Sequence, residues 1–262
     1  MCTSSSTTAV TCSASPATDE RSIVVGSLLL RGMLVGIVAG LLAFGFARIF
    51  GEPPLESAIG FEHHQAHATG APHQHEEELV SRTTQAGLGL LTGVVVYGAA
   101  AGGLFALVFA FVYGRVGRLG PRATAALLAL AVFVAVILVP ALKYPANPPA
   151  VGDPETIGYR TALFFGMVAI SMAALVIAVM LGRRLAGSMN VWNAGLLAGA
   201  VFVAIVAAAQ YVLPEIDEIP EHFSAGVLWR FRLASLGLQV VLWATLGLLF
   251  GAVTARSVRL RR

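Results

Sequence analysis

Residues 123–142 read Ala-Thr-Ala-Ala-Leu-Leu-Ala-Leu-Ala-Val-Phe-Val-Ala-Val-Ile-Leu-Val-Pro-Ala-Leu, a stretch with no charged side chain. A helix needs about 20 mainly apolar residues to cross the hydrocarbon layer of a bilayer. Because no water is available there for unpaired backbone groups, such a block is expected to be helical. Five further blocks of mainly apolar residues lie at about 28–50, 86–113, 161–181, 192–213 and 233–254. The sequence predicts an all-α fold, a polytopic integral membrane bundle of about six transmembrane helices.

The composition of the whole chain is that of a membrane protein. Of its 262 residues, 57% are hydrophobic and 12% are charged, whereas about a quarter of the residues of a soluble domain are charged. Residues 1–22 are rich in Ser and Thr and lack an apolar core, so we expect a disordered cytoplasmic tail and no secretory signal. Residues 23–262 are expected to form one transmembrane helical domain.

Acidic and basic side chains are sorted between the connecting segments. All 14 carboxylates lie outside the six blocks, and the segments after the second, fourth and sixth blocks contain none. Because cytoplasmic loops collect positive charge, we expect a multi-pass protein of the cell (inner or plasma) membrane with both termini in the cytoplasm. The net charge of +3 is explained by arginines beside anionic lipid and needs no nucleic-acid partner. The acid-free segments carry Arg115, Arg118, Arg122, Arg183, Arg184, Arg256, Arg259, Arg261 and Arg262.

An arginine precedes or opens each of the three blocks that run inward, at Arg82, Arg160 and Arg232. These arginines either mark an internal two-helix repeat, as in many transporters, or extend to the interface and pair with outer carboxylates. The outer segment 143–154 contains four prolines, which forbid a regular helix. It is expected to be a rigid lid or re-entrant mouth, or else a stiff connector.

Five of the six histidines lie in segment 51–82, which is expected to be an outer loop. Neutral imidazole is a good ligand for cobalt, nickel, copper and zinc, and carboxylate oxygens can complete the coordination. If residues 62–68 form a helical turn, His63 and His67 share one face at spacing i, i+4. The candidate metal ligands are Glu62, His63, His64, His67, His73, His75 and Glu76.

Two other interpretations of the histidine segment stay open. It is a polar loop with no specific ligand, or a pH sensor whose histidines titrate. No spacing in it matches a defined motif such as H-E-x-x-H. Thiolates are absent from the segment, which argues against a structural zinc site.

The apolar blocks contain more signs of packing than of chemistry. Gly32, Gly36 and Gly40 recur every four residues, which lets helix backbones approach closely; a glycine-lined pore is the alternative. No block has a carboxylate or histidine near its middle, where ion pathways usually show them. No nucleophile–base pair, G-x-S-x-G or Walker-type loop was found, so we do not expect an enzyme.

Several motifs resemble a known family. The runs Leu30-Arg31-Gly32-Met33-Leu34 and Gly45-Phe46-Ala47-Arg48-Ile49-Phe50-Gly51-Glu52-Pro53 are similar to the first span of the probable cobalt transporter subunit family, CbtA. The same holds for Leu142-Lys143-Tyr144-Pro145-Ala146-Asn147-Pro148-Pro149-Ala150-Val151-Gly152-Asp153-Pro154 and for Trp229-Arg230-Phe231-Arg232-Leu233-Ala234-Ser235. The resemblance extends from residue 28 to residue 255. Members of the family are usually described with about five spans, one fewer than the blocks counted here.

The resemblance implies cobalt uptake linked to cobalamin synthesis, beside a small one-span, His-bearing subunit of the CbtB type; a homo-oligomer is a further expected assembly. We therefore predict a permease component for a divalent transition-metal cation, cobalt, with no tightly bound cofactor. The alternative is a metal-binding or sensing membrane protein that does not itself conduct ions. No nucleotide-binding motif is present, so an ATP-driven step would need a separate subunit.

Overall fold

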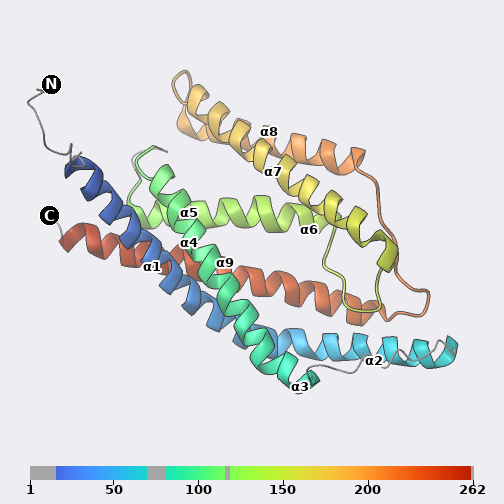
Figure 1. Ribbon diagram of the computed structural model, residues 1–262. Helices are drawn as coiled ribbons and strands as arrows, with labels where there is room; N and C mark the ends of the chain where they lie inside the picture. Colours follow the sequence, from blue (N-terminus) through green and yellow to red (C-terminus); the bar gives the residue numbers. More distant parts are fainter. Residues whose placement is uncertain (1–15, 70–80, 116–118, 261–262) are drawn as a thin grey trace, which may run out of the picture.

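The computed structural model describes residues 16–69, 81–115 and 119–260. Within these residues all regular structure is helical, and six helical segments are long and apolar enough to cross a membrane. They form a bundle in which successive long helices run in opposite directions (Figure 1). The prediction of an all-α polytopic bundle with six spans is confirmed. The six segments are Gly26–Gln65, Arg82–Val112, Pro121–Lys143, Pro154–Leu185, Val191–Val212 and Ala225–Ser257.

The first span belongs to a helix much longer than its apolar block. Helix α1 (Pro16–Phe46) continues through a π-helical turn, η1 (Ala47–Gly51), into α2 (Glu52–Thr69). We expected a tail up to residue 22 and a loop from residue 51. Instead the helix begins at Pro16 and includes the first part of the expected loop; residues 1–15 and 70–80 lie outside the described residues.

The second and third spans also contain π-helical turns. The second consists of α3 (Arg82–Thr84), η2 (Gln85–Gly89) and α4 (Leu90–Val112), and the third of α5 (Pro121–Val132), η3 (Phe133–Leu138) and α6 (Val139–Lys143). Both η1 and η3 come directly before proline-bearing helix, at Pro53 and Pro140. Proline removes a backbone donor and collides with the carbonyl four residues back, and the wider π turn accommodates this within a continuous helix.

The remaining spans are regular. A 3-10 turn, η4 (Pro154–Thr156), leads into α7 (Ile157–Leu185), which is followed by α8 (Val191–Val212) and α9 (Ala225–Leu260). The two chain ends lie at the same end of the bundle (Figure 1), as an even number of spans requires. We call the opposite end, which contains α2 and segments 144–156 and 213–224, the distal end.

The glycine stripe of α1 packs against α4. An added Cβ at Gly36 would collide with the carbonyl oxygen of Gly98, and one at Gly32 would collide with that of Gly102. An added Cβ at Gly40 would lie 2.8 Å from the Val94 carbonyl oxygen. The backbones of α1 and α4 therefore meet almost directly, so the glycines serve helix packing and do not line a pore.

Two apolar cores hold the six spans together. The larger core joins α1, α4, α5 and α9 and includes Phe105, Phe109 and Phe250; the edge-on rings of Phe109 and Phe250 have centroids 5.1 Å apart. The smaller core joins α6, α7 and α8 around Met167. Helices α5 and α6 lie between the α7–α8 pair and the other spans (Figure 1).

Candidate functional site

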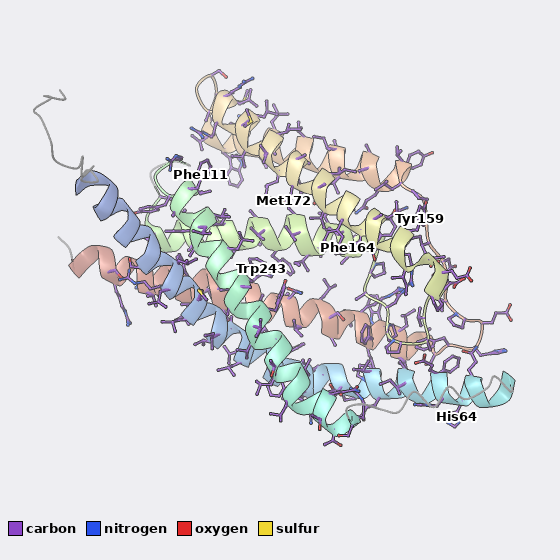
Figure 2. The ribbon with its side chains drawn as sticks, in the orientation of Figure 1. His64, Phe111, Tyr159, Phe164, Met172 and Trp243 are labelled. Atoms are coloured by element: carbon purple, nitrogen blue, oxygen red, sulfur yellow. The ribbon has the colours of Figure 1, made fainter. Side chains whose placement is uncertain are left out.

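The structure places the first candidate ligands on a helix. Glu62, His63 and His64 are exposed side chains in α2, and Figure 2 shows His64 at the distal end of the molecule. His67 lies one turn after His63 in the same helix, which satisfies the condition for the predicted i, i+4 pair. Three of the candidates, His73, His75 and Glu76, lie outside the described residues. Among the described residues no group of three His, Cys, Asp or Glu side chains converges on a metal position.

Helix α2 is docked against the distal end of the bundle. The ring of Phe61 packs edge-on against that of Phe223, with centroids 5.1 Å apart. Ala58, Val151 and Leu228 belong to the same buried cluster. The histidine-bearing end of α2 therefore stands beside the segments that close the distal end of the bundle.

Two arginine contacts fix the base of α2. Arg82 Nη2 donates to Glu52 Oε2 at 2.7 Å, and Arg48 Nη1 donates to the carbonyl oxygen of Ala86 at 3.3 Å. The Ala86 carbonyl lies in the π turn η2. Of the two interpretations of the arginines before the apolar blocks, pairing with a carboxylate outside those blocks holds for Arg82.

A cavity of about 890 Å³ opens at the distal end, between α6, α7, α9 and the two distal segments. Its mouth is polar, with Lys143, Asn147 and Asp217 among the lining residues. Its wall on α9 runs from Arg232 inward to Gln239. Val151 lines the cavity and also packs in the cluster that anchors α2, so the histidine helix and the cavity share a wall.

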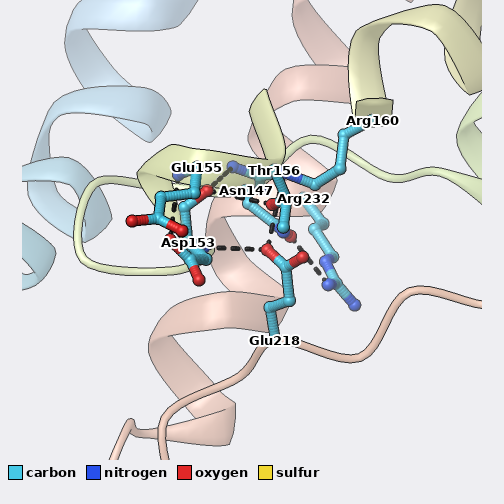
Figure 3. A network of polar contacts seen from close by, with 7 residues as sticks. All are labelled: Asn147, Asp153, Glu155, Thr156, Arg160, Glu218 and Arg232. Atoms are coloured by element: carbon cyan, nitrogen blue, oxygen red, sulfur yellow. Dashed lines mark hydrogen bonds and ion pairs between the residues drawn. The ribbon is translucent and has the colours of Figure 1, made fainter. Parts of the chain in front are cut away.

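One network ties the two distal segments together (Figure 3). The backbone N–H of Asp153 donates to Glu218 Oε2 at 2.8 Å, and Arg160 Nε lies 3.5 Å from the same carboxylate oxygen. Arg160 Nη2 also donates to the Asp153 carbonyl oxygen at 3.2 Å. The Asp153 N–H, together with the Thr156 side chain and the Arg160 charge, holds the pKa of Glu218 below its ordinary value. The pairing interpretation therefore also holds for Arg160.

The proline-rich segment is built to receive Arg160. Gly152 has φ of +112°, a conformation that disfavours side chains. An added Cβ at Gly152 would collide with the Arg160 guanidinium, so glycine is needed for space as well. Asp153 Oδ1 then accepts from the Glu155 N–H at 2.9 Å and caps the turn that opens α7. The segment is thus a fixed wall of the cavity mouth.

Two further contacts close the rim of the cavity. Tyr144 donates its hydroxyl to the Pro214 carbonyl oxygen at 2.9 Å, and burial raises the pKa of Tyr144 above its ordinary value, which keeps the hydroxyl a donor. Lys143 Nζ lies 3.6 Å from Glu215 Oε1.

Arg232 differs from Arg82 and Arg160, because its Nη2 donates to the neutral Asn147 Oδ1 at 2.8 Å. No described carboxylate is at ion-pair distance from Arg232, so the predicted pairing is wrong for this arginine.

Polar groups inside the spans mostly serve helix contacts. Ser171 of α7 donates to the carbonyl oxygen of Ala135 in the π turn η3, and Gln210 Nε2 donates to the Val139 carbonyl oxygen at 3.3 Å. Both side chains use backbone acceptors beside η3 and Pro140. Gln239, Trp243 and Thr254 of α9 are exceptions, because each has a buried side-chain nitrogen or oxygen atom without a hydrogen-bond partner.

A family model described as "Probable cobalt transporter subunit (CbtA)" matches residues 25–255. The chain belongs to this family. The match covers nearly the whole chain and agrees with the resemblance seen in its motifs. The part of this CbtA chain that the structure describes contains six long apolar helices. It is a multi-pass membrane protein of a transporter-subunit family. Comparisons with curated proteins and with solved structures found no match.

Sequence reasoning missed the cavity, although it singled out two of its arginines. Arg160 and Arg232 were visible as charges at the edges of apolar blocks. Their partners, Glu218 and Asn147, are far away in sequence; Asn147 is 85 residues from Arg232. The available signal was the helical spacing of Arg232, Ser235 and Gln239, which places polar groups on one face of α9.

Proposed function

We propose that this CbtA protein is the membrane-spanning component of a system that takes up a divalent transition-metal cation, cobalt, for cobalamin synthesis. The distal end faces outward in this proposal, and both termini are cytoplasmic, as the arginine distribution favours. The histidines of α2 and the segment after it collect the metal. A small one-span, His-bearing CbtB-type subunit or a second copy of the chain completes the assembly.

The observation that supports this proposal is the position of the histidine helix. Phe61 packs on Phe223, and Val151 joins that cluster to the wall of the distal cavity. A metal ion held by His63 and its neighbours would thus be concentrated beside the mouth of the cavity. Neutral imidazole and carboxylate are the ligand types that suit cobalt.

The alternative function is metal binding or sensing without conduction. It is favoured by the interior of the bundle, since the buried polar or charged residues among those described are Glu52, Thr124, Ser171 and Thr254. Ion pathways usually carry ionisable groups near mid-membrane, and Glu52 is the first residue of α2, just beyond the apolar block 28–50.

Uptake of radioactive cobalt separates the two functions. A host deficient in cobalt uptake is given the wild-type chain, or a variant with His63, His64, His67, His73 and His75 replaced by alanine, each with and without the small subunit. We expect accumulation with the wild type and a strong reduction in the variant at low external cobalt. Metal binding to the purified protein without any accumulation in cells would instead support the alternative.

A further inference from the structure

The distal cavity is lined by basic side chains, which have no role in the capture of a bare cation by histidines. Its wall carries three basic side chains, Lys143, Arg160 and Arg232. We propose that this cavity is a binding site for a small oxyanion ligand of the hydroxy-di- or tricarboxylate class, with Arg232 as the main cationic contact. The proposal concerns binding alone and does not depend on the proposed transport function.

Arg232 is the group with unused binding capacity. Lys143 and Arg160 each have a carboxylate oxygen nearby, at 3.6 Å and 3.5 Å. Arg232 has instead a neutral amide partner, Asn147, and the acid that acts on its charge, Asp217, lies beyond ion-pair distance. A guanidinium binds a carboxylate through two parallel N–H···O bonds, so an arriving carboxylate would supply the close negative charge that Arg232 lacks.

The acids at the cavity do not cancel this charge. The side chain of Glu215 is 92% exposed, and Asp217 is also exposed, so solvent screens both. Arg232 is partly buried, and its field is screened less. The inner part of the cavity, where Arg232 lies, therefore attracts anions.

The inner end of the cavity selects for a donor group on the ligand. Arg232, Ser235, Leu236 and Gln239 lie on one face of α9, at spacing i, i+3, i+4 and i+7, and all four line the cavity. Gln239 lies about 10 Å deeper along the helix axis than Arg232. The Gln239 side chain lines this inner end, and its amide is a group to which a ligand hydroxyl can hydrogen-bond. A ligand that places one carboxylate near Arg232 and a hydroxyl deeper in the cavity belongs to the hydroxy-polycarboxylate class.

The size of the cavity also fits a small molecule. Its volume of about 890 Å³ is within the range of small-ligand sites, about 300–1,000 Å³. Oxygen-rich carboxylates also coordinate divalent metals, though less selectively than imidazole. If the proposed uptake holds, the cargo could therefore arrive as an anionic chelate; that consequence, unlike the binding itself, rests on the proposed function.

Calorimetry on the detergent-purified full chain tests the site, with citrate as the probe and no metal present. We expect citrate to bind the wild type, and Arg232→Gln to weaken binding by about tenfold or more, as for a lost charge-assisted contact. Arg230→Gln is the matched control, because Arg230 is exposed two residues away in α9 and does not line the cavity. If Arg232→Gln does not purify as a folded protein, Arg232→Lys takes its place, with a smaller but measurable weakening.

A second arm distinguishes a soluble ligand from a lipid headgroup. Wild type and Arg232→Gln are placed in nanodiscs of phosphatidylcholine with phosphatidylglycerol, and the retained phosphatidylglycerol is measured by native mass spectrometry. We expect equal retention in both. Retention that depends on Arg232, without citrate binding, would assign the oxyanion to a lipid and overturn the small-molecule site. The proposal is also overturned if citrate does not bind the wild type, or if both arginine variants weaken citrate binding equally.

Discussion

Glu52 and Arg82 form an ion pair that joins the first long helix to the start of the second, with Oε2 and Nη2 2.7 Å apart. The Glu52 side chain is 8% exposed and that of Arg82 is 33% exposed. In sequence the two residues flank the histidine-bearing part of the chain. The pair therefore fixes the base from which α2 extends. Its loss should lower both the stability of the protein and its capture of metal.

Replacing Arg82 by glutamine should destabilise the protein, because Glu52 would keep a buried charge without its partner. We expect a loss of about 1.5–3 kcal/mol, the range for hydrogen bonds to charged groups. Because Arg82 is partly exposed, the loss should fall short of that for a fully buried pair. Unfolding of the detergent-solubilised protein measures it.

Glu56→Gln is the matched control, since Glu56 is an exposed carboxylate one turn further along α2. It should change the unfolding free energy by about 0.5 kcal/mol or less. Adding Glu52→Gln to Arg82→Gln should recover part of the loss, because the double variant leaves no buried charge. A double variant less stable than Arg82→Gln alone would contradict this account.

Replacing Gly36 by leucine should separate α1 from α4. Its new side chain would meet the backbone of Gly98, which cannot rotate away as a side chain can. Overpacking costs roughly 1–3 kcal/mol in soluble cores, and we expect at least a comparable loss here, measured as thermal stability in detergent. Gly45→Leu is the control, because nothing lies within 4 Å of a Cβ at Gly45. Similar melting of both variants would show that the stripe is not a packing face.

The helical spans and the glycine contact were predictable because both depend on local sequence. Apolar blocks of membrane length can only be helices, and glycines every four residues lie on one helix face. The extension of the helix through Pro53 to Thr69 was not predictable, because polar residues and prolines suggest a loop. The structure permits it through the π turn η1 and by docking Phe61 on Phe223, a contact between residues far apart in sequence. Arg232 was expected to find a carboxylate, but the fold gives it Asn147.

The histidine segment can be tested by direct metal binding. Replacing His63, His64, His67, His73 and His75 together by alanine should weaken cobalt binding to the purified protein. In the wild type, binding should also weaken as the pH is lowered, because protons compete with the metal for imidazole nitrogen. Isothermal calorimetry at several pH values measures both effects.

His222→Ala is the control for the histidine variant. His222 is an exposed distal histidine outside the segment, so its removal should leave cobalt affinity within about twofold of the wild type. Equal cobalt affinity in the wild type and the fivefold variant would rule out the segment as the binding site. It would leave the oxyanion cavity untouched, because none of these histidines lines it.

The contact between Glu218 and Asp153 should make the distal end sensitive to acid. The pKa of Glu218 is lowered in the folded protein, first by the Asp153 N–H and also by the Arg160 charge. A carboxyl with a lowered folded pKa contributes stability that is present above its unfolded pKa of about 4.5 and is lost as the pH falls through the folded value. At pH 7 the wild type should therefore melt at a higher temperature than Glu218→Gln, and this difference should shrink below pH 4.5.

Glu221→Gln controls for the loss of an exposed carboxylate in the same segment. A difference between wild type and Glu218→Gln that stays constant from pH 7 to pH 3 would mean that the ionised carboxylate does not hold the two segments together.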